Sequence, residues 1–298
     1  GGSLRWVHRG CLRRWQAAVL LGGAPARPPG EGGARERRHA VCGVCGAPFS
    51  LAPPSREAML REQLGEPLVA QLVPGALLVH TPHPPLPDAA AALPPMILTL
   101  LRLKRAHWER GVYLVTGATP GEEGDGEAVV TAVNLTRPMA PEGQEPTGER
   151  RGCELLLSYE GVAAEVAFFN GGPVDWSNAR LAAAPAPASA ALSPSADAGD
   201  GPVTRLTLPA DGGEALLGPL RDLSGALADA DAAGPHRVRV FCGYGRWGWV
   251  QLLAEFARGD WGVCPAALAD VFAAEPESLW AHVREGRHVL YPPCAAGA

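Results

Sequence analysis

The sequence predicts an α+β protein in which a small module containing cysteine and histidine precedes a larger domain of strands and helices. Three observations lead to this fold class. A strand, a glycine-rich turn and an amphipathic helix follow one another between Val238 and Trp261. Short runs of alternating apolar residues, typical of strands, recur between residues 75 and 170. Two pairs of potential metal ligands lie in the first 50 residues, ahead of a proline-containing linker at residues 51–54.

The stretch from Val238 to Trp261 is the densest packing unit of the chain. Residues 236–242 alternate as a strand does, and Gly259 lies where a glycine commonly ends a helix. Between them the apolar residues recur at helical spacing: Trp249, Val250, Leu252, Leu253, Phe256 and Ala257. One wide apolar face of this helix is therefore predicted to be buried.

Three glycines of this stretch also spell G-x-G-x-x-G, the fingerprint of dinucleotide binding, at positions 243, 245 and 248. The spacers, however, include Tyr244, Arg246 and Trp247, which are bulky where a pyrophosphate needs open backbone amides. We therefore interpret the glycines as a tight turn that packs the strand on the helix. Nucleotide binding stays the less favoured hypothesis.

The same stretch resembles the signature of the YqgE/AlgH family. The matching residues are Gly243, Tyr244, Trp247, Gly248, Gln251, Leu252, Glu255 and Trp261. Two further stretches resemble family motifs in the same order, Val133–Pro138 and Phe168–Val174. The resemblance implies an α+β fold with a bifurcated sheet and packed helices. It implies a binding or regulatory role, because the family has no assigned reaction to carry over.

Composition separates the two parts of the chain. The net charge of −5 divides into +6 for the first 50 residues, which hold eight arginines, and −11 for the rest. The seven cysteines lack the regular spacing of a disulfide framework, which favours a reducing compartment. No apolar run approaches the roughly 18 residues of a membrane span. We expect an intracellular protein, of the cytoplasm or an organelle such as a plastid, that binds no nucleic acid.

The metal-ligand pairs of the first module are His8 with Cys11 and Cys42 with Cys45. Each pair is separated by two residues, a spacing that lets two ligands reach one tetrahedral Zn²⁺ from a tight turn. The flanking residues resemble the second half of the RING-CH family, a variant zinc finger of ubiquitin ligases. The resemblance implies two zinc ions in a cross-brace and four further ligands upstream of Gly1, so we expect the chain to be a fragment. One zinc ion held by all four residues is the alternative.

The RING-CH resemblance also implies partners. Such a module supplies no catalytic nucleophile; it holds a ubiquitin-conjugating enzyme and favours transfer of ubiquitin to a protein substrate. Leu12 and Trp15 occupy the positions where the family presents apolar contacts to that enzyme. Packing beneath the zinc loop is an equally good account of Trp15.

The remaining elements are predicted from periodicity and turn signals. A helix is expected over residues 55–72, capped by Ser55 and interrupted near Pro67. Strands are expected at 75–81, 96–103, 111–116, 129–135, 155–157 and 166–169, and helices at 216–230, 268–272 and 277–284. Residues 182–201 are of low complexity and are predicted to form a disordered insertion in the domain 55–298.

Two hypotheses follow for function. The first is a zinc-dependent ubiquitin ligase module with the YqgE/AlgH-like domain as a binding or regulatory scaffold. The second is a non-enzymatic YqgE/AlgH-like binding protein with a vestigial zinc module. In the larger domain, the polar residues expected to line a cleft are Arg137, Tyr244, Gln251 and Glu255. Buried hydrogen bonds that hold the strand, turn and helix together are the equally good alternative for these residues.

Overall fold

The computed structural model describes residues 11–12, 48–49, 55–82, 96, 108–119, 128–139, 164–185, 203–219, 222–223 and 236–292. The chain divides into two compact units, Gly1–Leu64 and Gly65–Ala298. The predicted linker at residues 51–54 lies outside the described residues, and the division between the units falls after Leu64.

The first unit contains the helix α3 (Arg56–Leu64). The side-chain oxygen of Ser55 accepts a 3.1 Å hydrogen bond from the backbone N–H of Ala58, as an N-cap residue does. Glu57 and Arg61, one turn apart, form an ion pair at 2.9 Å. The predicted cap at Ser55 is therefore confirmed.

The predicted helix 55–72 is interrupted at Gly65. This residue has a φ of 82°, a left-handed conformation that glycine adopts without steric cost. The short helix α4 (Glu66–Val69) follows it and carries Pro67 in its first turn, where a missing N–H costs no hydrogen bond. The helix therefore ends at Leu64, three residues before the proline that was expected to break it.

Nine strands within the described part of the second unit form one curled, mostly antiparallel sheet. Their order is β6-β7-β5-β8-β3-β2-β1-β9, with β4 paired to β8 off this path. The strands are β1 (Ala76–His80), β2 (Val112–Thr119), β3 (Val129–Asn134), β4 (Ala164–Asn170), β5 (Val174–Pro185), β6 (Thr204–Thr207), β7 (Glu214–Gly218), β8 (His236–Gly248) and β9 (Trp261–Pro265).

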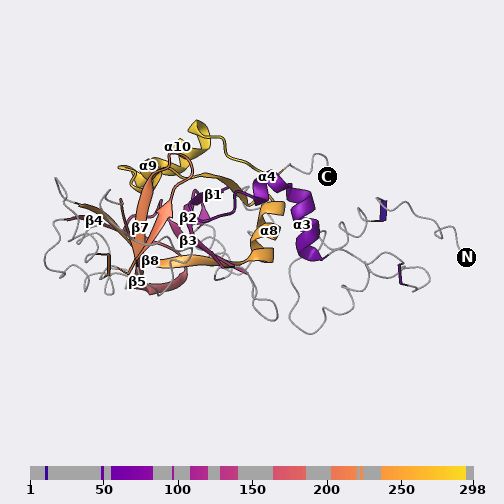
Figure 1. Ribbon diagram of the computed structural model, residues 1–298, viewed down its shortest axis with the longest axis horizontal. Coiled ribbons are helices and arrows are strands. Elements are labelled where there is room, and N and C mark those ends of the chain that lie inside the picture. Colours follow the sequence, from indigo (N-terminus) through magenta and orange to yellow (C-terminus); the bar gives the residue numbers. More distant parts are fainter. Residues whose placement is uncertain are drawn as a thin grey trace, which may run out of the picture. The chain divides into compact units, whose positions relative to one another are not determined.

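The sheet branches along its longest strand, β8, which is the long orange strand of Figure 1. The first half of β8 pairs with β4 in parallel, and it also pairs with β5 in antiparallel orientation. Its last residues, 245–248, pair with β3 instead. One continuous strand therefore joins the β6-β7-β5 branch to the β3-β2-β1-β9 branch.

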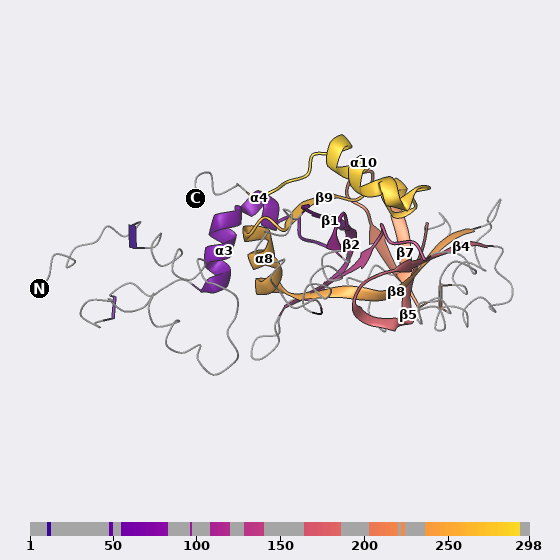
Figure 2. The same cartoon turned by 180° about the vertical axis from the view of Figure 1, so that it is seen from behind.

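Short helices and one main apolar cluster complete the unit. The helix α8 (Trp249–Ala257) follows β8 directly, while α9 (Leu268–Val271), the 3₁₀ turn η3 (Pro276–Ser278) and α10 (Leu279–Gly286) follow β9. Apolar residues of α9 and α10, among them Val271, Leu279 and Val283, pack with inward-facing residues of β1, β2 and β3. Figure 2 shows α10, in yellow, lying over the sheet.

Several sequence predictions need correction. The predicted glycine turn at 243–248 is part of β8, and β9 at residues 261–265 was not predicted. Residues 216–218 of the predicted helix 216–230 belong to the strand β7, whose apolar run is buried between β5 and β6. A short buried apolar run has no period that separates a strand from a helix. Met96 is the one described residue of the predicted strand 96–103, and it is helical. Residues 182–185, the first four of the predicted disordered insertion, belong to the strand β5.

In the part of the chain that the structure describes, no helix combines the length and the apolar character needed to cross a membrane.

Candidate functional site

The three stretches that resembled family motifs meet at one place in the second unit. The backbone N–H of Asn134 donates to the carbonyl of Gly171 at 2.9 Å, and the N–H of Gly171 donates to the carbonyl of Cys242 at 2.7 Å. The N–H of Asn170 in turn donates to the carbonyl of Arg137 at 2.9 Å. Segments far apart in sequence are therefore joined here through their backbones.

Glycine is required at this junction because two backbones approach each other closely. A Cβ atom added to Gly171 would lie 2.2 Å from the carbonyl oxygen of Gly243. A Cβ atom added to Gly172 would lie 2.2 Å from the carbonyl carbon of Tyr244. The glycines at 243, 245 and 248 thus belong to a strand against which other glycines pack, which removes the structural context that a phosphate-binding loop needs.

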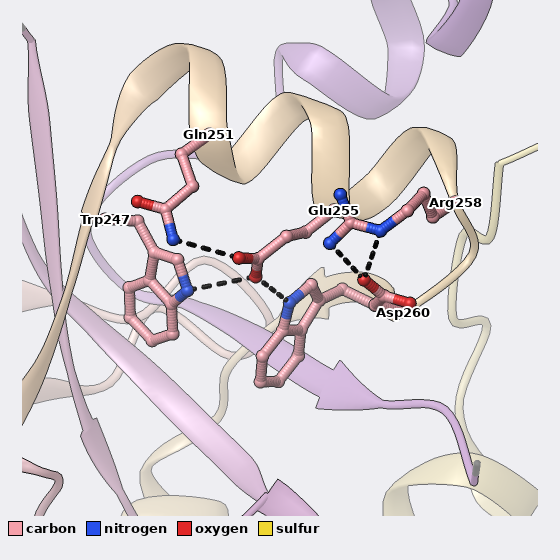
Figure 3. A network of polar contacts seen from close by, with 6 residues as sticks. Trp247, Gln251, Glu255, Arg258 and Asp260 are labelled. Atoms are coloured by element: carbon pink, nitrogen blue, oxygen red, sulfur yellow. Dashed lines mark hydrogen bonds and ion pairs between the residues drawn. The ribbon is translucent and has the colours of Figure 1, made fainter. Parts of the chain in front are cut away.

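The Glu255 carboxylate, on α8, accepts three hydrogen bonds from neutral side chains (Figure 3). Its Oε2 accepts from the indole Nε1 of Trp247 at 3.1 Å and from the indole Nε1 of Trp261 at 2.9 Å. Its Oε1 accepts from Nε2 of Gln251 at 3.0 Å. One carboxylate therefore ties the end of β8, the helix α8 and the start of β9 together.

The two indoles belong to a buried aromatic cluster of Trp108, Tyr113, Trp247 and Trp261. The ring centroids lie between 5.3 Å (Trp108 to Tyr113) and 6.0 Å (Tyr113 to Trp247) apart. Several pairs are edge-to-face, including Trp247 with Trp261 at 87°. Edge-to-face contacts of this kind bring the positive edge of one ring to the negative face of the next, which stabilises the cluster.

Two buried polar atoms of this region have no hydrogen-bond partner among the described residues. They are the hydroxyl of Tyr113 and the side-chain Nδ2 of Asn134, and both residues are fully buried. Burial raises the pKa of the Tyr113 hydroxyl well above its ordinary value, while the neighbouring Asn134 amide and Arg137 charge lower it by less. The hydroxyl therefore stays protonated at neutral pH.

The structure brings together only two of the four predicted cleft residues, Gln251 and Glu255. Gln251 and Glu255 bond to each other, whereas the Arg137 Nη2 donates to the carbonyl of Glu109 at 3.1 Å. Tyr244 pairs with Val174 and packs against the main apolar cluster. Glu255 bonds to Trp247 and Trp261 on two strands, as the alternative prediction describes, whereas the bond between Gln251 and Glu255 is exposed and lies within α8.

The predicted zinc module is largely outside the described residues, which do not include His8, Trp15, Cys42 and Cys45. Cys11 is described and is an exposed free thiol, and Leu12 beside it is half-buried. Within the described ranges, no three histidine, cysteine or acidic side chains lie close enough together to hold a metal ion.

Cys242 is a buried cysteine of the strand β8. It is 3% exposed and disulfide-bonded. The other described cysteines, Cys11 and Cys264, are free thiols.

A pocket of about 300 Å³ lies between α9, η3 and α10. Its polar lining consists of Asp270, Glu275, Ser278, His282 and Arg287. Asp270 is buried, and it accepts hydrogen bonds from the backbone N–H of Ala267 at 2.7 Å and from Nη2 of Arg287 at 2.9 Å. Burial raises the pKa of this carboxyl, and the hydrogen bond from Ala267 and the charge of Arg287 lower it by less.

Sequence reasoning missed Trp108, Tyr113, Asn134 and Asp270. Trp108 is separated from Trp247 by more than a hundred residues, and only the order of the strands brings the two together. Asn134 lies in the motif-like stretch 133–138, which is the one sequence signal that could have identified it.

The fold is that of an α+β domain with a branched sheet, in which one carboxylate lies between two indoles. The sequence model of the family DUF179, described as AlgH-like, matches residues 131–289, which is just over half of the chain. The protein therefore belongs to the AlgH-like family. The family predicted from residues 243–261 is thus confirmed, while the RING-CH resemblance stays a prediction.

Relatives match over short segments. A UPF0301 protein of Thermobifida fusca is 44% identical over 57 residues, which are 18% of this chain and 29% of that protein. A UPF0301 protein of Chlorobium luteolum is 37% identical over 75 residues, which are 24% of this chain and 40% of that protein. The matched segments therefore span less than half the length of these relatives.

Two solved structures are similar over more of the chain. A crystal structure of a protein from Corynebacterium diphtheriae has a TM-score of 0.42 at 21% identity, covering 72% of this chain and 87% of that one. The solution structure of the AlgH protein from Pseudomonas aeruginosa has a TM-score of 0.38 at 20% identity, covering 72% and 89%.

Proposed function

We propose that residues 65–298 form a non-enzymatic binding or regulatory domain. The observation that carries this proposal is the engagement of Glu255, the acidic residue of the predicted cleft. Both of its carboxylate oxygens accept hydrogen bonds from the protein itself. A catalytic acid or base must instead present an oxygen to substrate at hydrogen-bond distance.

Other polar groups of the region support the same proposal. The Tyr113 hydroxyl is buried and kept protonated by its raised pKa, so it is not available as a base at neutral pH. Asp270, beside the pocket at α9, is held by Ala267 and Arg287. Asp270 thus stabilises the start of α9, which is a structural role and not a catalytic one.

The test is the substitution Glu255→Gln, with Glu277→Gln on the exposed turn η3 as its matched control. A glutamine has one acceptor oxygen in place of two, and it removes the charge that strengthens both indole hydrogen bonds. We expect a loss of about 1–3 kcal/mol of stability, measured by denaturant unfolding, and no loss for Glu277→Gln. An unchanged or increased stability of Glu255→Gln would show that Glu255 is not a brace, and would overturn the proposal.

A second candidate function concerns the first 50 residues. We propose that His8, Cys11, Cys42 and Cys45 bind zinc and that Leu12 and Trp15 contact a ubiquitin-conjugating enzyme, which would make the module a ubiquitin ligase. The exposed free thiol of Cys11 supports this proposal, because a zinc ligand must be a thiolate free of disulfides.

Zinc content decides the second candidate. The purified full chain is expected to hold zinc measurable by elemental analysis, and Cys11→Ser is expected to lower that content. A metal-free chain, or a zinc-loaded chain that forms no ubiquitin chains with any of a panel of conjugating enzymes, would exclude the ligase.

A further inference from the structure

Two arginines and two aromatic residues gather on the surface beside the C-terminal helix α10. The Arg284 guanidinium carbon lies 5.0 Å from the centroid of the Trp280 ring, and that of Arg110 lies 5.9 Å from it. Tyr291, which is 39% exposed, is near enough to Arg284 for the arginine charge to lower its pKa against the opposing effect of burial. We call Arg110, Trp280, Arg284 and Tyr291 the α10 patch.

The indole of the α10 patch has a fixed position. The Trp280 Nε1 donates a 2.9 Å hydrogen bond to the carbonyl of His80, the last residue of β1. The half-buried ring is thus tied to the sheet at one edge, while two exposed guanidinium groups lie against it. Cation–π contacts of this kind orient arginine side chains without neutralising their charge.

Arg110 adopts a backbone conformation that arginine rarely takes. Its φ is 55°, and the turn that contains it is closed by a 3.0 Å hydrogen bond from the N–H of Gly111 to the carbonyl of Trp108. The left-handed region costs an L-residue roughly 1–2 kcal/mol, a cost that glycine does not have. The presence of a charged side chain at a position where glycine would be relaxed points to a function for that side chain.

The two arginine charges of the α10 patch are uncompensated within the described residues. Neither Arg110 nor Arg284 contacts a carboxylate there. Nearby arginines differ in this respect, since Arg287 binds Asp270 at 2.9 Å and Arg258 binds Asp260 at 2.6 Å. The patch therefore offers two guanidinium groups to an external anion.

We propose that the α10 patch is a docking surface for an acidic segment of a protein partner, whose Asp or Glu carboxylates bind Arg110 and Arg284. This proposal rests on the proposed binding function of residues 65–298 and names the chemistry of the partner. Trp, Tyr and Arg are the residue types that dominate binding energy at protein interfaces. Guanidinium groups bind carboxylates through paired, charge-assisted hydrogen bonds.

A protein partner fits the patch better than a nucleic acid. Nucleic-acid affinity comes from neutralising many phosphates along an extended basic surface. The α10 patch presents two arginines on a chain whose net charge is −5. Two or three carboxylates of a short acidic segment match this local charge.

The experiment measures binding of fluorescein-labelled decaglutamate to the full chain by fluorescence anisotropy. Arg284→Ala is expected to weaken binding about tenfold, as the loss of one charge-assisted contact does. Arg110→Gly is expected to weaken it similarly without lowering stability, since glycine tolerates the left-handed backbone. Arg258→Ala is the matched control, because it removes the same charge from an arginine that is already paired with Asp260.

Three results would overturn the proposal. The first is that decaglutamate does not bind. The second is that Arg258→Ala and Arg284→Ala weaken binding equally. The third is that a deoxythymidine ten-mer binds more tightly than decaglutamate. None of these binding results depends on the unfolding measurement for Glu255→Gln. The proposal for the α10 patch can therefore fail while the proposal for residues 65–298 stands.

Discussion

The indole N–H of Trp261 and the carboxylate of Glu255 are joined by a 2.9 Å hydrogen bond that links the strand β9 to the helix α8. Trp247, at the end of β8, donates to the same oxygen at 3.1 Å. The strand before α8 and the strand after it are thus fastened to one side chain of the helix. This arrangement explains why an acidic residue lies between two tryptophans that are each almost fully buried.

The first prediction concerns the coupling of Trp261 with Glu255. In a double-mutant cycle of Trp261→Phe and Glu255→Gln, we expect a coupling energy of about 1–3 kcal/mol, because the bond has a charged acceptor. Denaturant unfolding at neutral pH measures it. The control cycle pairs Glu255→Gln with Trp280→Phe, whose indole donates to His80 instead, and should give a coupling near zero. Equal coupling in both cycles would contradict the brace.

The second prediction concerns the crossing of Gly171 with β8. Gly171→Ala places a Cβ atom 2.2 Å from the carbonyl oxygen of Gly243, and backbone cannot move aside as a flexible side chain can. We expect a loss of at least about 1–3 kcal/mol, the usual cost of overpacking, measured as a lower denaturation midpoint.

Gly286→Ala at the end of α10 is the control for that substitution. An added Cβ atom there meets nothing within 4 Å, so its stability should be unchanged or slightly raised. If Gly171→Ala is tolerated as well as Gly286→Ala, the two backbones do not cross as closely as described.

The third prediction is a pH dependence due to Cys264. Burial in β9 raises the pKa of this thiol from its ordinary value of 9.0 to about 11. The unfolded thiol ionises first, so its contribution to stability is complete below pH 9 and is lost as the pH rises towards 11. Unfolding free energies of the wild type and Cys264→Ala, measured across this window, should converge. Parallel curves would show that the thiol is not shielded.

Alkylation provides a second readout for Cys264. Thiolates, not thiols, react with iodoacetamide. We therefore expect mass spectrometry to find the exposed Cys11 modified in the folded chain after zinc is removed with a chelator, and Cys264 modified only on unfolding.

Residue patterns predicted many of the elements correctly. The helix from Trp249, its end at Gly259 and the strand at 129–135 followed from local spacing and from the backbone freedom of glycine. The strand β7 did not follow, because its apolar residues are buried by β5 and β6 and so show no alternation. The continuation of β8 through three glycines was also missed. Glycine usually indicates a turn, and in a strand it marks a place where another backbone segment approaches closely.

The site was predicted in part. Gln251 and Glu255 were singled out as matches to the family signature, and the structure shows that they bond to each other on α8. Their partner Trp261 was quoted in the same resemblance, but no pattern indicated that its N–H reaches Glu255. Trp108, Tyr113 and Asn134 come from other strands, so only the order of strands in the sheet could place them nearby.

The amino-acid sequence by itself determined the AlgH-like family, the helix α8 and the positions where glycine is needed, because these depend on local spacing and backbone sterics. Only the tertiary structure decided what the glycines and Glu255 do. Gly171 allows the backbone of β8 to pass close by, and Glu255 accepts hydrogen bonds from two indoles. Both roles arise from contacts between segments distant in sequence, whose close approach depends on how the whole sheet pairs.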